Sequence, residues 1–453
     1  MLQVTLSLPS GRSASLSIPQ SSKVGDLKAL AKDAFATQGF FGLVTSDGRI
    51  LTDTEPLQAA GVEDGDTLTV IKRQAKLAAT QHAFALWCCG RDRVVTWGDP
   101  RVGGDSSAVQ HQLRRVQQIQ ATFGAFAAIL ESGFVATWGD PPRGGDSSYV
   151  QDQLKSVHQV QSTAGGAFAA ILEGGSVATW GSTMSGGNSS AVKDQLRGVQ
   201  QIQATANAFA AILEGGSVVT WGCAAHGGDS SAVRDQLRSV QQVQGTAEAF
   251  AAILEGGSVV TWGHAQHGGD CSAVRDQLRS VQEVQATYGA FAAILDSGSV
   301  VTWGNPRYGG DSSAVQDQLR RVYKVQATHG AFAAILEGGF VATWGDPYRG
   351  GDSSAVQDQL RRVKEVQASG SAFAAILESG SVVTWGYAPH GGDSSAVQDQ
   401  LKSVQQVQGT ANAFAAILEC GSVVAWGDPH HGGDISTVRD QIRNLFGPEE
   451  SAR

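Results

Sequence analysis

Apolar and polar residues alternate in two short runs at the start of the chain. Val4, Leu6 and Leu8 alternate with polar residues, and serines alternate with apolar residues over 13–18. Alternation with a period of two is typical of strands with one buried face. Because the Pro-Ser-Gly-Arg turn at 9–12 separates the two runs, they predict a β-hairpin.

The apolar spacing then changes from two to the period of a helix. Val24, Leu27 and Phe35 lie at helical spacing, and Ser21 or Ser22 precedes them as a candidate N-cap. The pattern therefore predicts a helix after the hairpin.

Short strands are predicted after the helix, at 42–45, around 50–51 and at 67–71. A hairpin, one helix and further strands is the element order of an α+β domain of the β-grasp type.

Three segments in this region resemble ubiquitin-like domains. They are Ser-Lys-Val-Gly-Asp-Leu-Lys at 22–28, Asp-Gly-Arg-Ile-Leu at 47–51, and Ala-Gly-Val-Glu-Asp-Gly-Asp-Thr-Leu at 60–68. The resemblance covers residues 1–74, about a sixth of the chain. It implies a β-grasp fold for this domain.

The same resemblance implies a recognition surface for ubiquitin receptors at Leu43, Val44 and Val70, although these can equally be ordinary half-buried strand residues. Conjugated members of the family end in Gly-Gly, whereas this segment continues through residues 72–76 as Lys-Arg-Gln-Ala-Lys. We therefore expect an integral module that is not conjugated at that point.

The rest of the chain, residues 75–447, contains nine tandem copies of a repeat of about 41 residues, and residues 448–453 form a tail. The tryptophans of the repeated Val-x-Thr-Trp-Gly segment are 41 residues apart, except for one step of 42 that the extra residue at Gly165-Gly166 explains. They are Trp97, Trp138, Trp180, Trp221, Trp262, Trp303, Trp344, Trp385 and Trp426.

One copy shows the pattern of three strands. Residues 325–328 alternate, residues 331–336 are apolar on both faces and leave room for one large ring, and residues 340–344 return after the Glu-Gly-Gly turn at 337–339. Such short units cannot bury their faces alone, so stacking of the copies is obligatory.

A short helix is predicted after the third strand. Val356, Leu360 and Val363 lie at helical spacing, and Ser354 and Gln357 have the spacing of a capping box.

The repeats resemble the regulator-of-chromosome-condensation family and, in the length of the unit, the propeller-type β-lactamase inhibitor proteins. The resemblance implies a mainly-β array of propeller type. That family usually has seven blades, whereas nine units are present here. Two arrangements stay open at this point, a closed, wide propeller and an open superhelix.

Differences among the near-identical copies are concentrated in two loops, the four residues after Trp-Gly and the residues before Ala-Phe. An up-down-up meander puts both loops on one face, which we predict binds a protein partner, because loops on a rigid scaffold often carry binding residues. Neutral drift in exposed loops is the alternative. The candidate residues are Arg101, Phe123, Arg143, His226, His267, Tyr288, Arg307, Tyr308, His329, Tyr348, Arg349, Tyr387, His390 and His431.

The opposite face is predicted to be uniform and acidic, because the hairpin between the second and third strands is nearly constant. Its acidic residues are Glu131, Glu173, Glu214, Glu255, Asp296, Glu337, Glu378 and Glu419.

Charge and cysteine usage narrow the set of partners. Residues 1–76 have no net charge, so the repeats carry the whole net charge of −9. An acidic array lacks a basic surface that would attract nucleic acid or an anionic membrane. We therefore expect neither of them as a partner. Five cysteines without paired spacing and an N-terminus unlike a signal peptide favour a cytoplasmic or nuclear protein.

No catalytic, metal or cofactor site is predicted. The Gly-Gly-Asp-Ser-Ser segment lacks the lysine of a phosphate-binding loop and reads as a helix cap. The invariant tryptophans beside valines read as core, and each loop histidine reads as solvated rather than ligating.

These observations favour a non-catalytic adaptor, in which the array holds a protein partner and the ubiquitin-like domain recruits ubiquitin receptors or the proteasome. The first alternative is a guanine-nucleotide exchange factor for a small GTPase. The second is a non-catalytic substrate-recognition part of a ubiquitin ligase assembly. Catalysis of ligation within the chain is not expected, since the chain ends at Arg453, soon after the ninth copy.

Overall fold

The alternating N-terminal residues form a four-stranded sheet in the computed structural model, which describes residues 1–8, 11–35, 41–49, 51, 55–72, 75–88 and 92–446. The sheet order is β2-β1-β4-β3, with β1 parallel to β4 and the other pairs antiparallel. The strands are β1 (Leu2–Ser7), β2 (Ser13–Ile18), β3 (Phe41–Val44) and β4 (Thr67–Lys72), and the helix is α1 (Val24–Phe35).

Helix α1 packs on one face of this sheet. Val24, Leu27 and Phe35 are buried with Val4 and Leu6 of β1, as the helical spacing predicts. The start of the helix differs from the prediction, because the Asp26 carboxylate accepts a hydrogen bond from the Lys23 N–H at 2.9 Å. This contact caps the first turn from within the helix.

The strand predicted around residues 50–51 is not among the strands of the sheet. Ile50 lies outside the described residues, and Leu51 is buried and donates its N–H to the Leu43 carbonyl at 2.8 Å without forming a strand.

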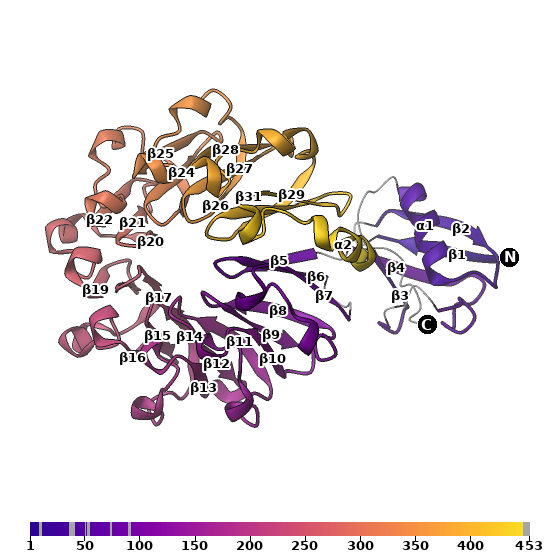
Figure 1. Cartoon of the computed structure of the whole chain (residues 1–453), viewed down its shortest axis with the longest axis horizontal. Helices are drawn as coiled ribbons and strands as arrows, with labels where there is room; N and C mark the ends of the chain where they lie inside the picture. Colours follow the sequence, from indigo (N-terminus) through magenta and orange to yellow (C-terminus); the bar gives the residue numbers. More distant parts are fainter. Residues whose placement is uncertain are drawn as a thin grey trace.

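Each of the nine repeats forms one antiparallel three-stranded sheet, as the pattern predicts. The first strands face the centre of the array in Figure 1. They are β5 (Ala75–Ala79), β8 (Val116–Ala121), β11 (Val157–Ser162), β14 (Val199–Ala204), β17 (Val240–Gly245), β20 (Val281–Ala286), β23 (Val322–Ala327), β26 (Val363–Ala368) and β29 (Val404–Gly409).

The middle strand of every sheet contains the Ala-Phe sequence. These strands are β6 (Ala83–Cys88), β9 (Ala125–Leu130), β12 (Ala167–Leu172), β15 (Ala208–Leu213), β18 (Ala249–Leu254), β21 (Ala290–Leu295), β24 (Ala331–Leu336), β27 (Ala372–Leu377) and β30 (Ala413–Leu418).

The third, outer strand of every sheet ends in Trp-Gly. These strands are β7 (Val94–Gly98), β10 (Val135–Gly139), β13 (Val177–Gly181), β16 (Val218–Gly222), β19 (Val259–Gly263), β22 (Val300–Gly304), β25 (Val341–Gly345), β28 (Val382–Gly386) and β31 (Val423–Gly427).

Two 3-10 segments follow each outer strand, and a further one, η5 (Glu173–Gly175), lies in the hairpin of the third sheet. The first of the two holds the variable residues. These segments are η1 (Pro100–Val102), η3 (Pro141–Arg143), η6 (Thr183–Ser185), η8 (Ala224–His226), η10 (Ala265–His267), η12 (Pro306–Tyr308), η14 (Pro347–Arg349), η16 (Ala388–His390) and η18 (Pro429–His431).

The second 3-10 segment follows Gly-Gly-Asp, or Gly-Gly-Asn in the third repeat. These segments are η2 (Ser107–Val109), η4 (Ser148–Val150), η7 (Ser190–Val192), η9 (Ser231–Gln236), η11 (Ser272–Gln277), η13 (Ser313–Val315), η15 (Ser354–Val356), η17 (Ser395–Gln400) and η19 (Ser436–Val438), and η19 leads into helix α2 (Arg439–Phe446). Among the residues that the structure describes, no helix is long and apolar enough to span a membrane.

The helix predicted at 354–363 is wrong in extent. It is the single 3-10 turn η15, and Val363 already belongs to β26. The Asp352 carboxylate, rather than Ser354, caps the turn by accepting the Ser354 N–H at 2.9 Å. Gln357 turns away from a capping box and donates its amide to the Val341 carbonyl at 3.0 Å, because that outer strand lies beside the turn.

Neighbouring sheets stack through alternate residues of the middle strand. Ala331, Ala333 and Ile335 of β24 pack against Phe373 and Trp385 of the next sheet. Small side chains on one sheet thus accommodate the large rings of the next. Burial of each such ring contributes about 1.5–3 kcal/mol.

One hydrogen bond recurs at every junction between sheets. Within a sheet the phenylalanine and tryptophan rings stack, as Phe373 and Trp385 do at 5.1 Å, and the indole N–H of Trp385 donates to the Gly350 carbonyl of the preceding repeat at 3.0 Å. Gly350 must be glycine, since its φ is +93° and a Cβ there would lie 2.6 Å from the Phe373 ring.

The ninth repeat makes these same contacts with the first, so the array is a closed ring (Figure 1). The Trp97 indole donates to the Gly432 carbonyl at 3.0 Å, and the Ala411 N–H donates to the Gln81 carbonyl at 3.1 Å. Ile442 and Leu445 of α2 are buried with Trp97. Of the two arrangements left open by the sequence, the closed one is therefore found.

The variable loop face

The two variable loops of each repeat lie on the same face of the ring, here called the loop face. The inner strand ends there, the middle strand begins there, and the outer strand returns there. In the seventh sheet the Asp346 N–H, just after β25, donates to the Gly330 carbonyl, just before β24, at 2.9 Å. The up-down-up prediction of a shared face is correct.

A buried hydroxyl holds the two loops together in the repeat unit. Thr328 accepts the N–H groups of Gly330 and Ala331 at 3.2 and 2.9 Å and donates to the Arg349 carbonyl at 3.0 Å. Ser369 makes the same set of bonds in the eighth repeat. The backbone of the loop face is therefore fixed by a residue that does not itself vary beyond threonine and serine.

The four variable residues after Trp-Gly have two orientations. In the seventh repeat Asp346 and Arg349, the first and fourth, are half-buried, whereas Pro347 and Tyr348, the second and third, are exposed. Tyr348 is 82 % exposed. Arg101, Arg307 and Tyr348, all at the third position, thus point away from the scaffold.

The fourth residues and the residues just before the middle strands form a rim around the centre, here called the inner rim. Successive members touch across the junctions: Ser185 contacts Asn207, His226 contacts Glu248, and His431 contacts His82. The described members with polar or aromatic side chains are His82, Arg143, Ser185, Asn207, His226, Glu248, His267, Tyr308, Arg349, Ser371, His390, Asn412 and His431.

A cavity of about 650 Å³ lies inside the inner rim and is lined by residues of all nine repeats. Most of its lining consists of alanine and threonine at the ends of the inner strands. Phe123, Tyr288 and His329 are the large side chains in it. These three predicted site residues therefore share one cavity, although they come from the second, sixth and seventh sheets.

The predicted arginines are less available as free cations than the sequence suggests. Arg101 forms an ion pair with Asp99 at 2.7 Å and lowers the pKa of that carboxyl. Arg143 and Arg349 lie 3.4 and 3.5 Å from the aspartates three residues earlier. Arg143 also covers the Phe123 ring at 4.4 Å. Arg307 follows Asn305, which carries no charge to neutralise it.

Four histidines of this face have lowered pKa values, His82, His267, His329 and His390. Burial lowers the pKa of His82, His267 and His390, and neighbouring histidines add to the effect. His329 is reached by water in the central cavity, yet the enclosing ring desolvates it, and Arg349 lowers its pKa further. Burial therefore favours the neutral form of these side chains. His82, His267 and His390 are half-buried rather than fully solvated.

Of the predicted residues, Arg143, His226, His267, Tyr308, Arg349, His390 and His431 lie on the inner rim, Phe123, Tyr288 and His329 line the cavity, and Arg101, Arg307, Tyr348 and Tyr387 point outward. The structure adds His82, Asn207, Glu248, Ser371 and Asn412 to the rim. Their position before Ala-Phe matched the loop pattern, but the sequence did not indicate that these side chains share a rim with the fourth loop residues.

The opposite face, here called the hairpin face, contains the exposed acidic residues as predicted. It is not uniformly acidic, however. Glu131, Glu337 and Glu378 form ion pairs of 2.8–3.0 Å with Arg115, Arg321 and Arg362. Each of these arginines directly precedes the inner strand of the same sheet as its glutamate. The variation at this position had no obvious meaning in the sequence.

The recognition surface predicted on the N-terminal sheet requires correction. Leu43 and Val70 are opposite each other in register and are buried beneath α1, with 0 % and 1 % exposure. They belong to the core and cannot contact a receptor. Val44 is half-buried, and with Ile71 it lies on the other side of the sheet.

A closed ring of nine sheets with small inner strands, stacked Phe-Trp pairs and one varied face defines a repeat protein of β-propeller type. No protein-family model and no curated protein matches the chain. The class therefore rests on the geometry of the ring and on its closure.

Similar solved structures include yeast RCC1 (Prp20) bound to Kap60, with 14 % identity over 74 % of this chain and 87 % of that chain and a TM-score of 0.42. The computationally designed Ika8 protein shows 12 % identity over 69 % of this chain and 96 % of that chain, at a TM-score of 0.35. The CRINKLY WD40 ectodomain of the Arabidopsis thaliana receptor kinase ACR4 shows 15 % identity over 60 % of this chain and 97 % of that chain, at a TM-score of 0.34. These scores are low and carry no functional assignment.

Proposed function

We propose that this protein is a non-catalytic adaptor of the cytoplasm or nucleus, in which the loop face of the ring binds a protein partner. One observation carries the proposal. Sequence variation among the nine repeats is concentrated in the two loops of one face, above a scaffold that repeats almost without change. Selection for a binding surface produces this pattern, because binding residues on loops can vary without loss of the scaffold.

The chemistry of the outward residues suits a protein partner. Tyrosine and arginine are enriched at the centres of protein interfaces. On this ring they concentrate at the sixth and seventh sheets, where Arg307 and Tyr348 are exposed beside the aromatic pair Tyr288 and Tyr308, whose ring centroids are 5.6 Å apart. The third repeat offers Met184 at this third position. We therefore propose that the partner contacts the sixth and seventh sheets most closely.

The second part of the proposal concerns the N-terminal unit. We propose that it is a ubiquitin-like β-grasp domain that recruits ubiquitin receptors or the proteasome, and that the outward side of its sheet, at Val44 and Ile71, makes the contact. Its strand order with parallel β1 and β4 beneath one helix supports the β-grasp fold. Free thiols at Cys223, Cys271 and Cys420 support a reducing compartment.

Affinity purification of the full-length chain from cell extract tests both parts. The variant Arg307→Ala with Tyr348→Ala should recover at least about tenfold less of the partner, since each hot-spot residue contributes more than about 1 kcal/mol. The variant Val44→Glu with Ile71→Glu should lose ubiquitin receptors alone. Phe340→Ser is the matched control, because Phe340 is exposed on the hairpin face and serine occupies its position in most repeats.

Equal loss with Phe340→Ser and with the loop-face variant would contradict binding by the loop face. Recovery of the same proteins by the wild type and by the Val44–Ile71 variant would contradict recruitment by the N-terminal unit. Recovery of a small GTPase, stripped of nucleotide, as the main partner would replace the adaptor by an exchange factor.

A further inference from the structure

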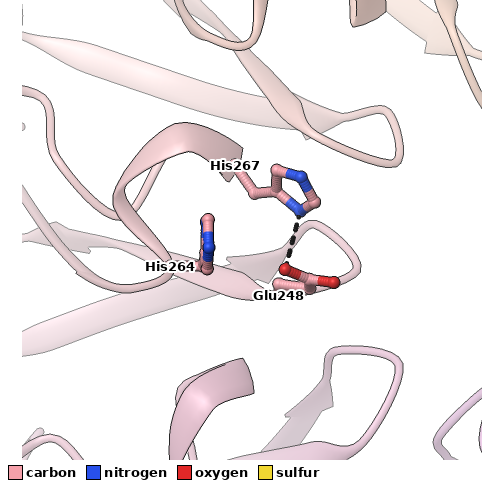
Figure 2. Close-up of side chains that lie close together, drawn as sticks. All are labelled: Glu248, His264 and His267. Atoms are coloured by element: carbon pink, nitrogen blue, oxygen red, sulfur yellow. Dashed lines mark ion pairs between the residues drawn. The ribbon is translucent and has the colours of Figure 1, made fainter.

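Two histidines and one glutamate converge at the fifth sheet. Glu248 precedes the middle strand β18, His264 precedes the turn η10, and His267 is the last residue of that turn. Figure 2 shows the Glu248 carboxylate directed toward the His267 ring, and His267 Nδ1 lies 3.1 Å from Glu248 Oε2. One ligand atom from each of the three side chains lies within 4.8 Å of the others.

The scaffold brings the three side chains together before any ligand is present. The His264 N–H donates to the Glu248 carbonyl at 2.9 Å, which joins the two loops, and the His267 N–H donates to the His264 carbonyl at 3.0 Å. Residues three apart in a 3-10 turn share one side of it. The Thr246 hydroxyl fixes the end of the turn through the His267 carbonyl at 3.0 Å.

His267 Nδ1 has an environment that a metal ion would complete. The atom is buried and has no hydrogen bond, because its close contact with Glu248 lacks hydrogen-bond geometry. Ligand atoms about 2.0–2.2 Å from a tetrahedral zinc ion lie roughly 3.3 Å from each other, which is close to the separation found between His267 and Glu248. His264 is exposed, so its ring can rotate to the same point.

Two hydrogen bonds from the neighbouring sheets position His226, whose ring lies beside the glutamate. Ser185 donates to Asn207 Oδ1 at 2.8 Å, so the Asn207 amide nitrogen faces His226 Nδ1 at 2.9 Å. Nδ1 of His226 therefore accepts, and the ring carries its proton on Nε2, which lies 3.9 Å from Glu248 Oε1. Second-shell groups of this kind hold ligating side chains in place.

We propose that Glu248, His264 and His267 form a site for a divalent transition-metal ion of the zinc class, with a coordination position open to solvent on the loop face. Two imidazoles with one carboxylate suit zinc, whereas magnesium and calcium prefer sites made wholly of oxygen ligands. The site does not depend on the proposed partner. The site was not predicted from the sequence, because Glu248 is 16 residues from His264 and falls outside any recognised metal-binding spacing.

The other repeats supply internal controls at equivalent positions. The eighth repeat has Ser371, Tyr387 and His390 there, which together offer one strong ligand. In the ninth repeat His431 Nδ1 is already paired with Asp428 Oδ2 at 2.6 Å. Within the described part of the chain, the fifth sheet alone gathers three such groups within reach of one ion.

The test is a zinc titration of the full-length chain after removal of metal by chelation and dialysis, followed by isothermal calorimetry and by measurement of zinc per chain. We expect one zinc per chain. His264→Ala, Glu248→Gln and His267→Ala should each abolish stoichiometric binding, and His226→Ala should weaken it by about 10–100-fold. His390→Ala should bind like the wild type.

Three outcomes would overturn the site: no stoichiometric zinc, binding unchanged in His264→Ala, or equal loss in His390→Ala. A sulfur-to-metal charge-transfer band in the cobalt-substituted protein would also overturn it, since it would assign the ion to the cysteines. His264 is exposed, so its alanine variant tests the site even if the Glu248 variant unfolds. Because the titration contains no protein partner, the metal site can be disproved while the adaptor proposal stands. Equally, the adaptor proposal can be disproved while the metal site stands.

Discussion

The loop face and the hairpin face of the ring are built on the same strands but are held by different means. On the loop face the Thr328 hydroxyl fixes the backbone, and the side chains of Pro347 and Tyr348 are exposed and do not hold the turn. On the hairpin face the backbone itself is the constraint, because Gly339 has a φ of +76° and a Cβ there would lie 2.7 Å from the Arg362 Cα. A turn held by a side chain elsewhere can vary, whereas a turn held by its own glycine cannot.

Removal of the Thr328 hydroxyl should have the largest effect. Thr328→Val leaves the buried N–H of Ala331 and the carbonyl of Arg349 without this partner, and each unsatisfied buried group costs about 1–3 kcal/mol. We expect the free energy of unfolding, measured with urea, to fall by about 2 kcal/mol or more. Thr328→Ser is the control, since Ser369 makes the same bonds in the eighth repeat. Equal destabilisation by both substitutions would assign the effect to packing instead.

A smaller effect is expected at the residue before each inner strand on the hairpin face. Ser280 has a φ of +54°, whereas the fourth sheet has Gly198 at the same position with a φ of +64°. The left-handed conformation costs an L-residue about 1–2 kcal/mol. Glycine avoids this cost, but it loses more conformational entropy on folding, which offsets part of the difference.

Ser280→Gly should therefore raise the free energy of unfolding by about 0.5 kcal/mol, and Gly198→Ser should lower it by a similar amount. Urea unfolding of both variants measures this pair of opposite shifts. Shifts of the same sign would show that the position is governed by side-chain contacts rather than by φ.

The smallest effect per residue concerns acid stability. Hydrogen bonds from the serine two residues later lower the pKa of the aspartate in each Gly-Gly-Asp segment, as for Asp352 with Ser354. A carboxylate with a lowered folded pKa stabilises the fold above its unfolded pKa of about 4 and loses this contribution as the pH falls through the folded value. The affected residues are Asp105, Asp146, Asp229, Asp270, Asp311, Asp352, Asp393 and Asp434.

Replacement of these aspartates by asparagine should keep the turns and flatten the loss of unfolding free energy below pH 4. Asn188 already forms the same turn in the third sheet, with its side chain accepting the Ser190 N–H at 2.9 Å. Urea unfolding at several pH values checks the slope. A slope as steep as that of the wild type would place the acid sensitivity elsewhere, for example in the carboxylates of the hairpin face.

The sequence predicts the repeated scaffold well, because period and redundancy reinforce each other there. The alternation in residues 325–328, the apolar run at 331–336, the glycines of the hairpin and the place of each tryptophan all correspond to the structure. The prediction of a helix at 354–363 was wrong because helical spacing of three apolar residues is also met by a 3-10 turn followed by a strand. Side-chain spacing alone does not separate these two.

The candidate site could be predicted only in part. The loop pattern located Tyr308, Tyr348 and their equivalents on one face, because strand direction follows from the meander. The contacts of His226 with Glu248 and of His82 with His431 join different repeats, and in the second case the two ends of the array. The first contact depends on how neighbouring repeats stack, and the second depends on ring closure, which the repeat pattern left undecided. The prediction of a recognition surface at Leu43 and Val70 was wrong, because alternation along a strand defines two faces but does not indicate which face the helix covers.

Closure through the last repeat has a consequence for the order of events during synthesis. Trp97 and Phe84 of the first sheet are buried only when Gly432 and the residues of α2 reach them, roughly 335 residues later in the chain. A nascent chain on the ribosome therefore presents the apolar side of its first sheet through almost the whole of translation. Each later sheet, in contrast, is covered by a segment that the ribosome has already released. The first sheet is thus the part of the molecule whose apolar surface a chaperone would have to cover for the longest time during synthesis.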